Sequence, residues 1–313
     1  MPAFPKPKFV FNFELDEELN NLSLHKIKRK IPEKNNTNLL FASWNIANLG
    51  AQNRWRAHYS LLAHIVEWFD IIAVQEVNNK LEGIRFLESE LPSYYSVTFS
   101  DTGGNNERSA FIYDSRKVKL SEMIGEIGIP PKDQRFIKIK GITQKFTGFD
   151  RNPFLCSFQW NNHIIVLITV HSFSGSTKKT DIERRALEAY AIGRYADLRN
   201  KSKYSFSKNI IALGDFNIPK IEKGDVVYVA LIQRGLVLPE HSAKVYSNIS
   251  DDKMFDQIAF LPSIKSKIQE QGIFDFDNAI FPELWKNETK KNFKAYLRYY
   301  ISDHRPLWMQ LKF

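Results

Sequence analysis

Short apolar runs, each about as long as a β-strand, recur along the chain from residue 39 onward. Several are apolar at successive positions, which is typical of central strands covered on both faces. The last run alternates instead and predicts one inward face that takes every second residue from Leu307 to Phe313. The runs are LLFASWNI (39–46), IIAVQEV (71–77), SAFIYD (109–114), FLCSFQW (154–160), HIIVLITVH (163–171), NIIALGDFN (209–217), FDQIAFL (255–261) and LWMQLKF (307–313).

Segments with apolar residues at helical spacing lie between several of these runs. The predicted helices span 55–69, 181–199 and 226–234. Thr180 and Glu183 fit a capping box at the start of the second helix, and Gly235 ends the third. This alternation of strands and helices predicts a single layered α/β domain over 39–313.

The first 38 residues have a different pattern. Segment 1–13 carries three prolines, 14–30 is compatible with a short charged helix, and 26–30 is a basic stretch followed by polar residues. Such a segment fits either a nucleic-acid-binding arm or a solvated extension, and we favour the extension. We therefore divide the chain into an N-terminal basic extension, 1–38, and a domain, 39–313.

Composition excludes several classes of protein. The 313 residues are 43% hydrophobic and 25% charged, so the chain is neither disordered nor collagen-like. No apolar run approaches the roughly 20 residues of a membrane span. The only cysteine, Cys156, cannot form an internal disulfide, and the N-terminus lacks an apolar signal core. We expect a cytoplasmic monomer.

The charge balance is basic. Lys and Arg number 44 against 35 acidic residues, which gives a net charge of +9. An excess of positive charge attracts polyanions such as nucleic acids, although a basic solubilising surface gives the same number.

Polar side chains stand at the ends of the apolar runs, where strands do not need them. Burying such groups unpaired costs several kcal/mol, so a row of them along one sheet edge predicts a site. Their carboxylate and amide oxygens suit Mg²⁺ or Mn²⁺, and two imidazoles suit proton transfer near neutral pH. These residues are Asn45, Glu76, His171, Asp215, Asn217, Asp256, Asp303 and His304.

Most of these residues also have an ordinary structural explanation when taken singly. The alternatives are a turn cap for Asn45, a solvated strand end for Glu76, a hydrogen-bonded core histidine for His171 and a turn acid for Asp256. GDFN (214–217) and SDHRP (302–306) are more specific, because each sets neighbouring polar groups directly beside a buried strand.

In combination, these motifs resemble the endonuclease/exonuclease/phosphatase superfamily, and within it most closely the pancreatic-type deoxyribonucleases. The resemblance implies a four-layer α/β sandwich with two packed mixed β-sheets flanked by helices. It also implies a divalent-metal-dependent phosphodiesterase that hydrolyses nucleic acid. The matching segments are WNIAN (44–48), VQEV (74–77), ERSAFIYD (107–114), FDRNPF (149–154), VHSFSG (170–175), GDFN (214–217), FDQIAF (255–260) and SDHRP (302–306).

The resemblance also implies a role for each matched residue. Glu76, Asn45 and Asp303 would ligate the metal. Asp215 and Asn217 would hold the attacking water or a second metal ion.

The two histidines would act on protons and the arginines on the phosphate. His304, oriented by Asp256, would be the general base. His171, oriented by Glu107, would donate to the phosphate or the leaving oxygen. Arg151 would contact the phosphate and Arg108 would add a further contact. The sequence leaves open which imidazole is the acid and which the base.

Departures from the pancreatic-type pattern leave the substrate open. Asn78 stands where those enzymes carry an arginine that enters the minor groove of DNA, so duplex binding is in doubt. A phosphoesterase acting on a small phosphoester or a phospholipid head group is the alternative. A non-catalytic binding module is the least favoured reading, because both histidines and their carboxylate partners are retained.

Overall fold

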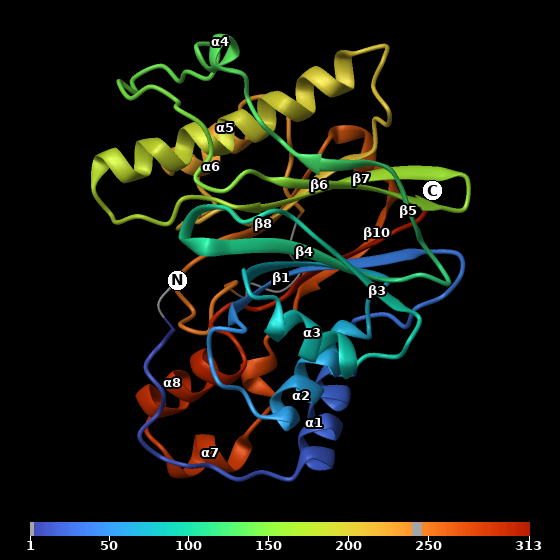
Figure 1. Ribbon diagram of the computed structural model, residues 1–313, viewed down its shortest axis with the longest axis vertical. Helices are drawn as coiled ribbons and strands as arrows, with labels where there is room; N and C mark the ends of the chain where they lie inside the picture. Colours follow the sequence, from blue (N-terminus) through green and yellow to red (C-terminus); the bar gives the residue numbers. More distant parts are fainter. Residues whose placement is uncertain (1–2, 240–245) are drawn as a thin grey trace.

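Two β-sheets pack face to face, and helices cover the outer face of each sheet (Figure 1). The computed structural model describes residues 3–239 and 246–313. The fold is the predicted four-layer α/β sandwich, with two packed mixed sheets between layers of helices.

The first sheet has six strands. In spatial order they are β10 (Ile268–Ile273), β11 (Leu307–Leu311), β1 (Leu39–Leu49), β2 (Ile71–Asn78), β4 (Glu107–Asp114) and β3 (Tyr95–Phe99). Only β1 and β2 pair in parallel, and the other neighbours are antiparallel.

The second sheet has five strands. Their order is β5 (Lys119–Glu126), β6 (Phe154–Trp160), β7 (His163–His171), β8 (Ile210–Asp215) and β9 (Asp256–Phe260). Here β7 and β8 form the parallel pair. Each sheet therefore has two central strands that end at the same edge.

Helices separate into two outer layers. The layer over the six-stranded sheet contains α1 (Leu15–Lys28), α2 (Arg56–Val66), α3 (Glu82–Ser89), α7 (Pro282–Asn287) and α8 (Lys290–Tyr300). The layer over the five-stranded sheet contains α4 (Pro131–Gln134), α5 (Lys179–Lys201) and α6 (Val226–Ile232). Short 3-10 helices lie at Gly104–Asn106, Pro262–Lys267 and Phe276–Asn278. No helix of the described residues is both long and apolar enough to cross a membrane.

Successive side chains of β11 point to opposite faces of the sheet, so this one strand contributes to two hydrophobic cores. Leu307, Met309 and Leu311 join the core between the sheets, as the sequence pattern predicted. Trp308 points the other way and packs into the core beneath the helices. Burial on both faces fixes the register, because a slip by one residue would exchange the two sets.

Two local predictions were wrong. The capping box is absent, because α5 begins at Lys179 and Thr180 therefore lies inside the helix rather than at its N-cap. The helix predicted over 55–69 ends at Val66, before the apolar periodicity does.

The segment before β1 also differs from the solvated extension that we expected. Phe11 and Phe13 pack their rings against Phe281, at centroid separations of 5.7 and 4.9 Å. Leu22 of α1 is fully buried in the core beneath the helices. Interleaved phenylalanines therefore act as anchors that hold this segment against the six-stranded sheet's helical layer.

Candidate active site

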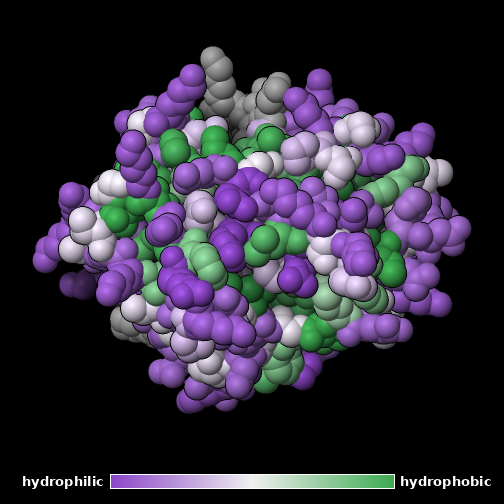
Figure 2. All heavy atoms as spheres, turned by 90° about the horizontal axis from the view of Figure 1, so that it is seen from above, coloured by the Kyte–Doolittle hydropathy of each residue, from purple (hydrophilic) through white to green (hydrophobic). Residues whose placement is uncertain are grey.

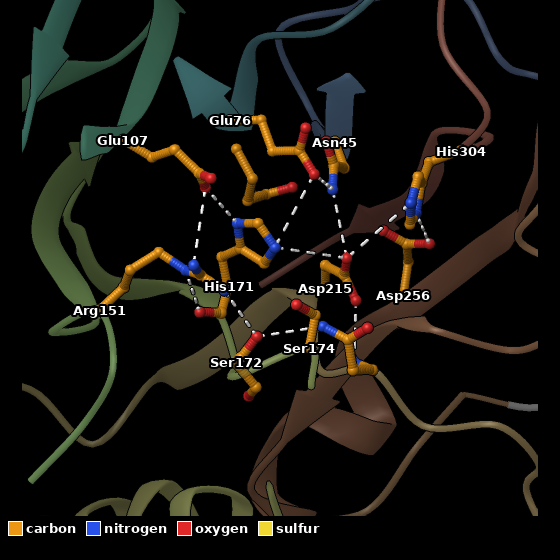
Figure 3. A network of polar contacts seen from close by, with 12 residues as sticks. Asn45, Glu76, Glu107, Arg151, His171, Ser172, Ser174, Asp215, Asp256 and His304 are labelled. Atoms are coloured by element: carbon orange, nitrogen blue, oxygen red, sulfur yellow. Dashed lines mark hydrogen bonds and ion pairs between the residues drawn. The ribbon is translucent and has the colours of Figure 1, made fainter. Parts of the chain in front are cut away.

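Strand register brings the predicted polar residues to one edge of the sandwich (Figure 3). Asn45 of β1 stands beside Gln75, the residue before Glu76 on β2. On the other sheet His171 of β7 is opposite Asp215 of β8, and Asp215 is opposite Asp256 of β9. Since the two parallel pairs end at the same edge, residues from distant parts of the chain meet there.

The centre of the site joins the two sheets. Asn45 Nδ2 donates to Glu76 Oε1 at 2.9 Å and to Asp215 Oδ2 at 3.2 Å, so one amide bridges two carboxylates. Glu76 Oε2 accepts the backbone N–H of Asn48 at 2.9 Å. Burial raises the pKa of Glu76, against the opposing attraction of His171.

The backbone at the centre is held in uncommon conformations. Asn48, Glu76 and Asn217 have φ of 51°, 61° and 52°, in the left-handed region. The β1–β2 and β2–β4 pairings also shift register around Asn48 and Glu76. Bulges and left-handed residues of this kind turn side chains out of the regular alternation, and they concentrate at functional sites.

His304 is oriented by a buried carboxylate. Its Nδ1 lies 2.8 Å from Asp256 Oδ2, and its Nε2 lies 3.9 Å from Asp215 Oδ2. Burial lowers the pKa of His304, but Asp256, Asp215 and Asp303 together raise it well above its usual value. With Nδ1 bonded to Asp256, the ring directs Nε2 toward the centre of the site.

His171 is oriented in the same way on the opposite side. Its Nδ1 lies 3.0 Å from Glu107 Oε2, while Nε2 is 3.8 Å from Asp215 Oδ2 and 3.9 Å from Glu76 Oε1. Burial raises the pKa of Glu107, but contact with His171 and the charge of Arg151 lower it overall. Both imidazoles therefore direct Nε2 toward Asp215.

The GDFN turn fixes the position of Asp215. Asp215 Oδ1 accepts the backbone N–H of Asn217 at 2.8 Å, and Asn217 Nδ2 donates to the carbonyl of Ser172 at 3.0 Å. This links the end of β8 to the residue that follows His171.

Three predicted residues have partners other than those the resemblance implied. Arg151 is buried and donates to the carbonyls of His171 and Ser172, at 3.0 and 2.9 Å. Arg108 donates to the Ser100 carbonyl at 2.7 Å and lines the same small pocket as His171.

Asp303, the third of them, forms an ion pair with α8. Its Oδ2 lies 3.0 Å from Nε of the half-exposed Arg298. The assignments of Asp303 to the metal and of both arginines to the phosphate stay predictions.

Several residues that the sequence analysis did not assign hold the site together. Gln75 Nε2 donates to Thr169 Oγ1 at 2.8 Å and so links β2 to β7 directly behind the site. Ser302 Oγ donates to the Asn45 carbonyl at 2.6 Å and accepts the His304 N–H at 3.0 Å. Gln75 and Ser302 lie inside matched motifs, which was the available signal.

The residues around Glu76 suit a divalent cation. Two buried carboxylates converge on one amide, and the buried Asn45 Oδ1 has no hydrogen-bond partner. Converging buried oxygens favour a hard cation such as Mg²⁺ or Mn²⁺. Among the described residues, Asp215, Asp256 and His304 form a further group that could hold a metal, with ligand atoms within 4.8 Å of one another.

Comparison with solved structures finds many proteins of the same fold. An endonuclease/exonuclease/phosphatase family protein from Bacteroides thetaiotaomicron is 19% identical, with a TM-score of 0.61 over 88% of this chain and 95% of that one. A mannosyl-6-phosphatase from the same organism is 18% identical, with a TM-score of 0.57 over 88% and 100%. D. rerio TDP2 complexed with single strand DNA product is 16% identical, with a TM-score of 0.54 over 88% and 100%.

At these identities the likeness is one of fold. No family model matches the chain, and no curated protein matches it significantly. The argument for a function therefore depends on the geometry of the site.

Proposed function

We propose that the chain belongs to the endonuclease/exonuclease/phosphatase superfamily and is a divalent-metal-dependent phosphodiesterase that hydrolyses nucleic acid. The observation that carries the proposal is the pair of carboxylate-backed imidazoles, His171 and His304, whose Nε2 atoms face Asp215 from opposite sides at 3.8 and 3.9 Å. A purely structural core does not need two such pairs around buried carboxylates.

His304 takes the proton of the attacking water. In the neutral ring the proton is on Nδ1, from which Asp256 accepts, so Nε2 is the nitrogen that accepts the proton of the water, and Asp256 stabilises the imidazolium that forms. The oxygen of that water forms the new bond to phosphorus as the bond to the leaving oxygen breaks.

His171 donates a proton to the leaving oxygen. Glu107 faces Nδ1 of its ring, so Nε2 is the atom directed at the substrate. Arg151 donates to the carbonyls of His171 and of Ser172, which restrains the backbone of His171 where the loop begins.

Glu76 and Asn45, with Asp215 beside them, are the residues that would hold Mg²⁺ or Mn²⁺. When bound, such an ion neutralises negative charge on the non-bridging phosphate oxygens. Because Glu76 is buried, few water molecules would compete with the ion for its carboxylate, and the attraction between them would be stronger than at the surface.

Nucleic acid is the proposed substrate because the chain has a net charge of +9 and shares its fold with a protein solved with a single-strand DNA product. A phosphomonoesterase is the second candidate, because a mannosyl-6-phosphatase has the same fold.

The first test removes each imidazole in turn. His304→Ala and His171→Ala are expected to reduce Mg²⁺-dependent cleavage of single-stranded DNA and RNA by about 10²-fold to 10⁴-fold. Circular dichroism and thermal melting are expected to show a retained fold.

His163→Ala is the matched control, because His163 begins the same strand that His171 ends. It is expected to cleave at the parental rate. Parental cleavage by either active-site variant would contradict the proposal, and hydrolysis of sugar phosphates alone would favour the second candidate.

A further inference from the structure

A long connection between β5 and β6 places positive charge on the helical layer over the five-stranded sheet. We call residues 127–150 the basic excursion. It carries five cations and only two acids, Asp133 and Asp150. The cations, Lys132, Arg135, Lys138, Lys140 and Lys145, are all exposed.

The basic excursion is anchored on α5. Ile137 and Phe146 are buried in the core of this layer, and Gln144 Nε2 donates to the Thr180 carbonyl at 2.9 Å. The basic excursion therefore lies along α5, from Thr180 in the first turn to Arg194, whose guanidinium carbon lies 5.4 Å from the Phe136 ring centroid.

This surface is continuous with the active site. The loop 172–178 leaves His171 and leads into α5, and its residues from Ser174 onward are exposed. Lys178 and Lys179 stand at the end of that loop, where a shallow groove of about 380 Å³ is lined by Lys179 and by Lys140 of the basic excursion.

The positive charge is largely uncompensated. None of the five cations of the basic excursion forms an ion pair with another described residue. Of the two lysines at the end of the loop, Lys179 has an ion-pair partner, and its Nζ lies 3.7 Å from Glu183 Oε1. Unpaired surface cations release counterions when they meet a polyanion, which makes binding favourable and dependent on salt.

An exposed aromatic ring lies among these cations. Phe136 is 44% exposed, and the guanidinium carbons of Arg135 and Arg194 lie 4.9 and 5.4 Å from its ring centroid. Aromatic and guanidinium faces of this kind stack on unpaired bases.

The surrounding surface argues against an anionic membrane as the partner. Figure 2 looks onto this helical layer and shows it as mainly hydrophilic, with apolar side chains in scattered patches. Ile137 and Phe146 of the basic excursion are packed inward, and Ile139 and Ile142 are half-buried where they line the groove beside Lys140. Of the large apolar side chains in this segment, only Phe136 is exposed enough to insert into a membrane.

We propose that the basic excursion, with Lys178 and Lys179, is a binding surface for single-stranded nucleic acid that leads the strand from the active site over the start of α5. This inference rests on the proposed function, and it adds the strand's path and its single-stranded form. Lys138, Lys140 and Lys145 contact the phosphates, and Phe136 stacks on a base.

The test separates binding from chemistry. We compare the parent with Lys138→Glu/Lys140→Glu/Lys145→Glu, using fluorescence anisotropy of a labelled single-stranded oligonucleotide over a range of salt. The triple variant is expected to bind at least ~10-fold more weakly, with a salt-dependence slope smaller by about 2, since each lost contact on a single strand removes about 0.7. Phe136→Ala is expected to weaken binding about fivefold or more.

A variant with the same change of charge elsewhere is the control. Lys119→Glu/Lys208→Glu/Lys312→Glu alters three exposed lysines near the sheet ends remote from the site. It is expected to bind the oligonucleotide more tightly than the first triple variant and close to the parental affinity.

Hydrolysis of bis(p-nitrophenyl) phosphate with Mg²⁺ is measured on the same proteins. All variants are expected to retain the parental rate, because none changes an active-site residue. A parent inactive on this ester overturns the proposed function. Parental binding by the first triple variant, or binding of phosphatidylserine vesicles in place of the oligonucleotide, overturns the inference alone.

Discussion

At the scale of single residues, the surroundings of Gly214 explain why the GDFN turn begins with glycine. Its φ is 138°, and a Cβ built there would lie 2.0 Å from the carbonyl oxygen of Val170 on the neighbouring strand. Val170 and Gly214 immediately precede His171 and Asp215. The absence of a side chain therefore allows the two strands to approach and sets the distance between two groups of the site.

Gly214→Ala is expected to destabilise the protein by at least ~2 kcal/mol, because the strand must move or adopt a strained backbone. A displacement of about 1 Å between His171 and Asp215 would also reduce activity about 100-fold. Urea unfolding and cleavage assays measure the two effects. Gly128→Ala is the control, since its Cβ would meet nothing within 4 Å, and equal stability of the two variants would contradict the prediction.

At the scale of elements, the contact between α2 and α8 depends on an uncharged histidine. His58 is fully buried, its ring stacks on Tyr300 at 4.3 Å, and its Nε2 lies 3.0 Å from the Tyr296 hydroxyl. Burial first, and then the charge of Arg54, lower the pKa of His58 to about 3. The packed helices therefore accept this imidazole only in its neutral form.

This gives the contact a defined dependence on pH. Between the ordinary pKa of 6.5 and the folded pKa of about 3, the unfolded chain binds a proton at His58 that the folded protein does not. Stability therefore falls as pH falls through this window. Urea midpoints measured between about pH 7 and about pH 4 are expected to fall less steeply for His58→Phe than for the parent, and parallel curves would contradict the assignment.

At the scale of the whole molecule, α1 near the start of the chain contacts a buried carboxylate far along the sequence. Asp275 is fully buried between β10 and α7, and it accepts hydrogen bonds from His25 and Arg29 at the end of α1. Burial raises the pKa of Asp275, but hydrogen bonds from His25, Arg29 and Asn278 lower it overall. The segment before β1 is therefore held by charge as well as by its phenylalanines.

Asp275→Asn is expected to lower the free energy of unfolding by about 3 kcal/mol, because it leaves Arg29 partly buried without its partner. Glu33→Gln is the control. Glu33 is 83% exposed and pairs with Lys26, so its loss is expected to cost less than about 1 kcal/mol. Chemical unfolding of both variants at neutral pH measures the difference, and equal losses would show that Asp275 is no anchor.

The sequence was most informative where strands are buried. The runs that became β7 and β8 are mostly apolar between their ends, so their existence and their polar ends could both be predicted. β5 was not predicted, because it is an edge strand with mostly exposed residues and so has no apolar run. The phenylalanines before β1 were read as part of an extension, because nothing local shows which distant surface will cover them.

By itself, the sequence determined the α/β class, the buried strands and the kinds of side chain that stand at their ends. These follow from short-range patterns, since a strand covered on both faces must be apolar and must end where polar groups begin. Only the tertiary structure decided several of the contacts that these side chains make. It turned Asp303 toward Arg298, used Arg151 to hold backbone carbonyls and set both histidines around Asp215. Side-chain direction at a sheet edge depends on how two sheets pack across the site, and no local pattern encodes that packing.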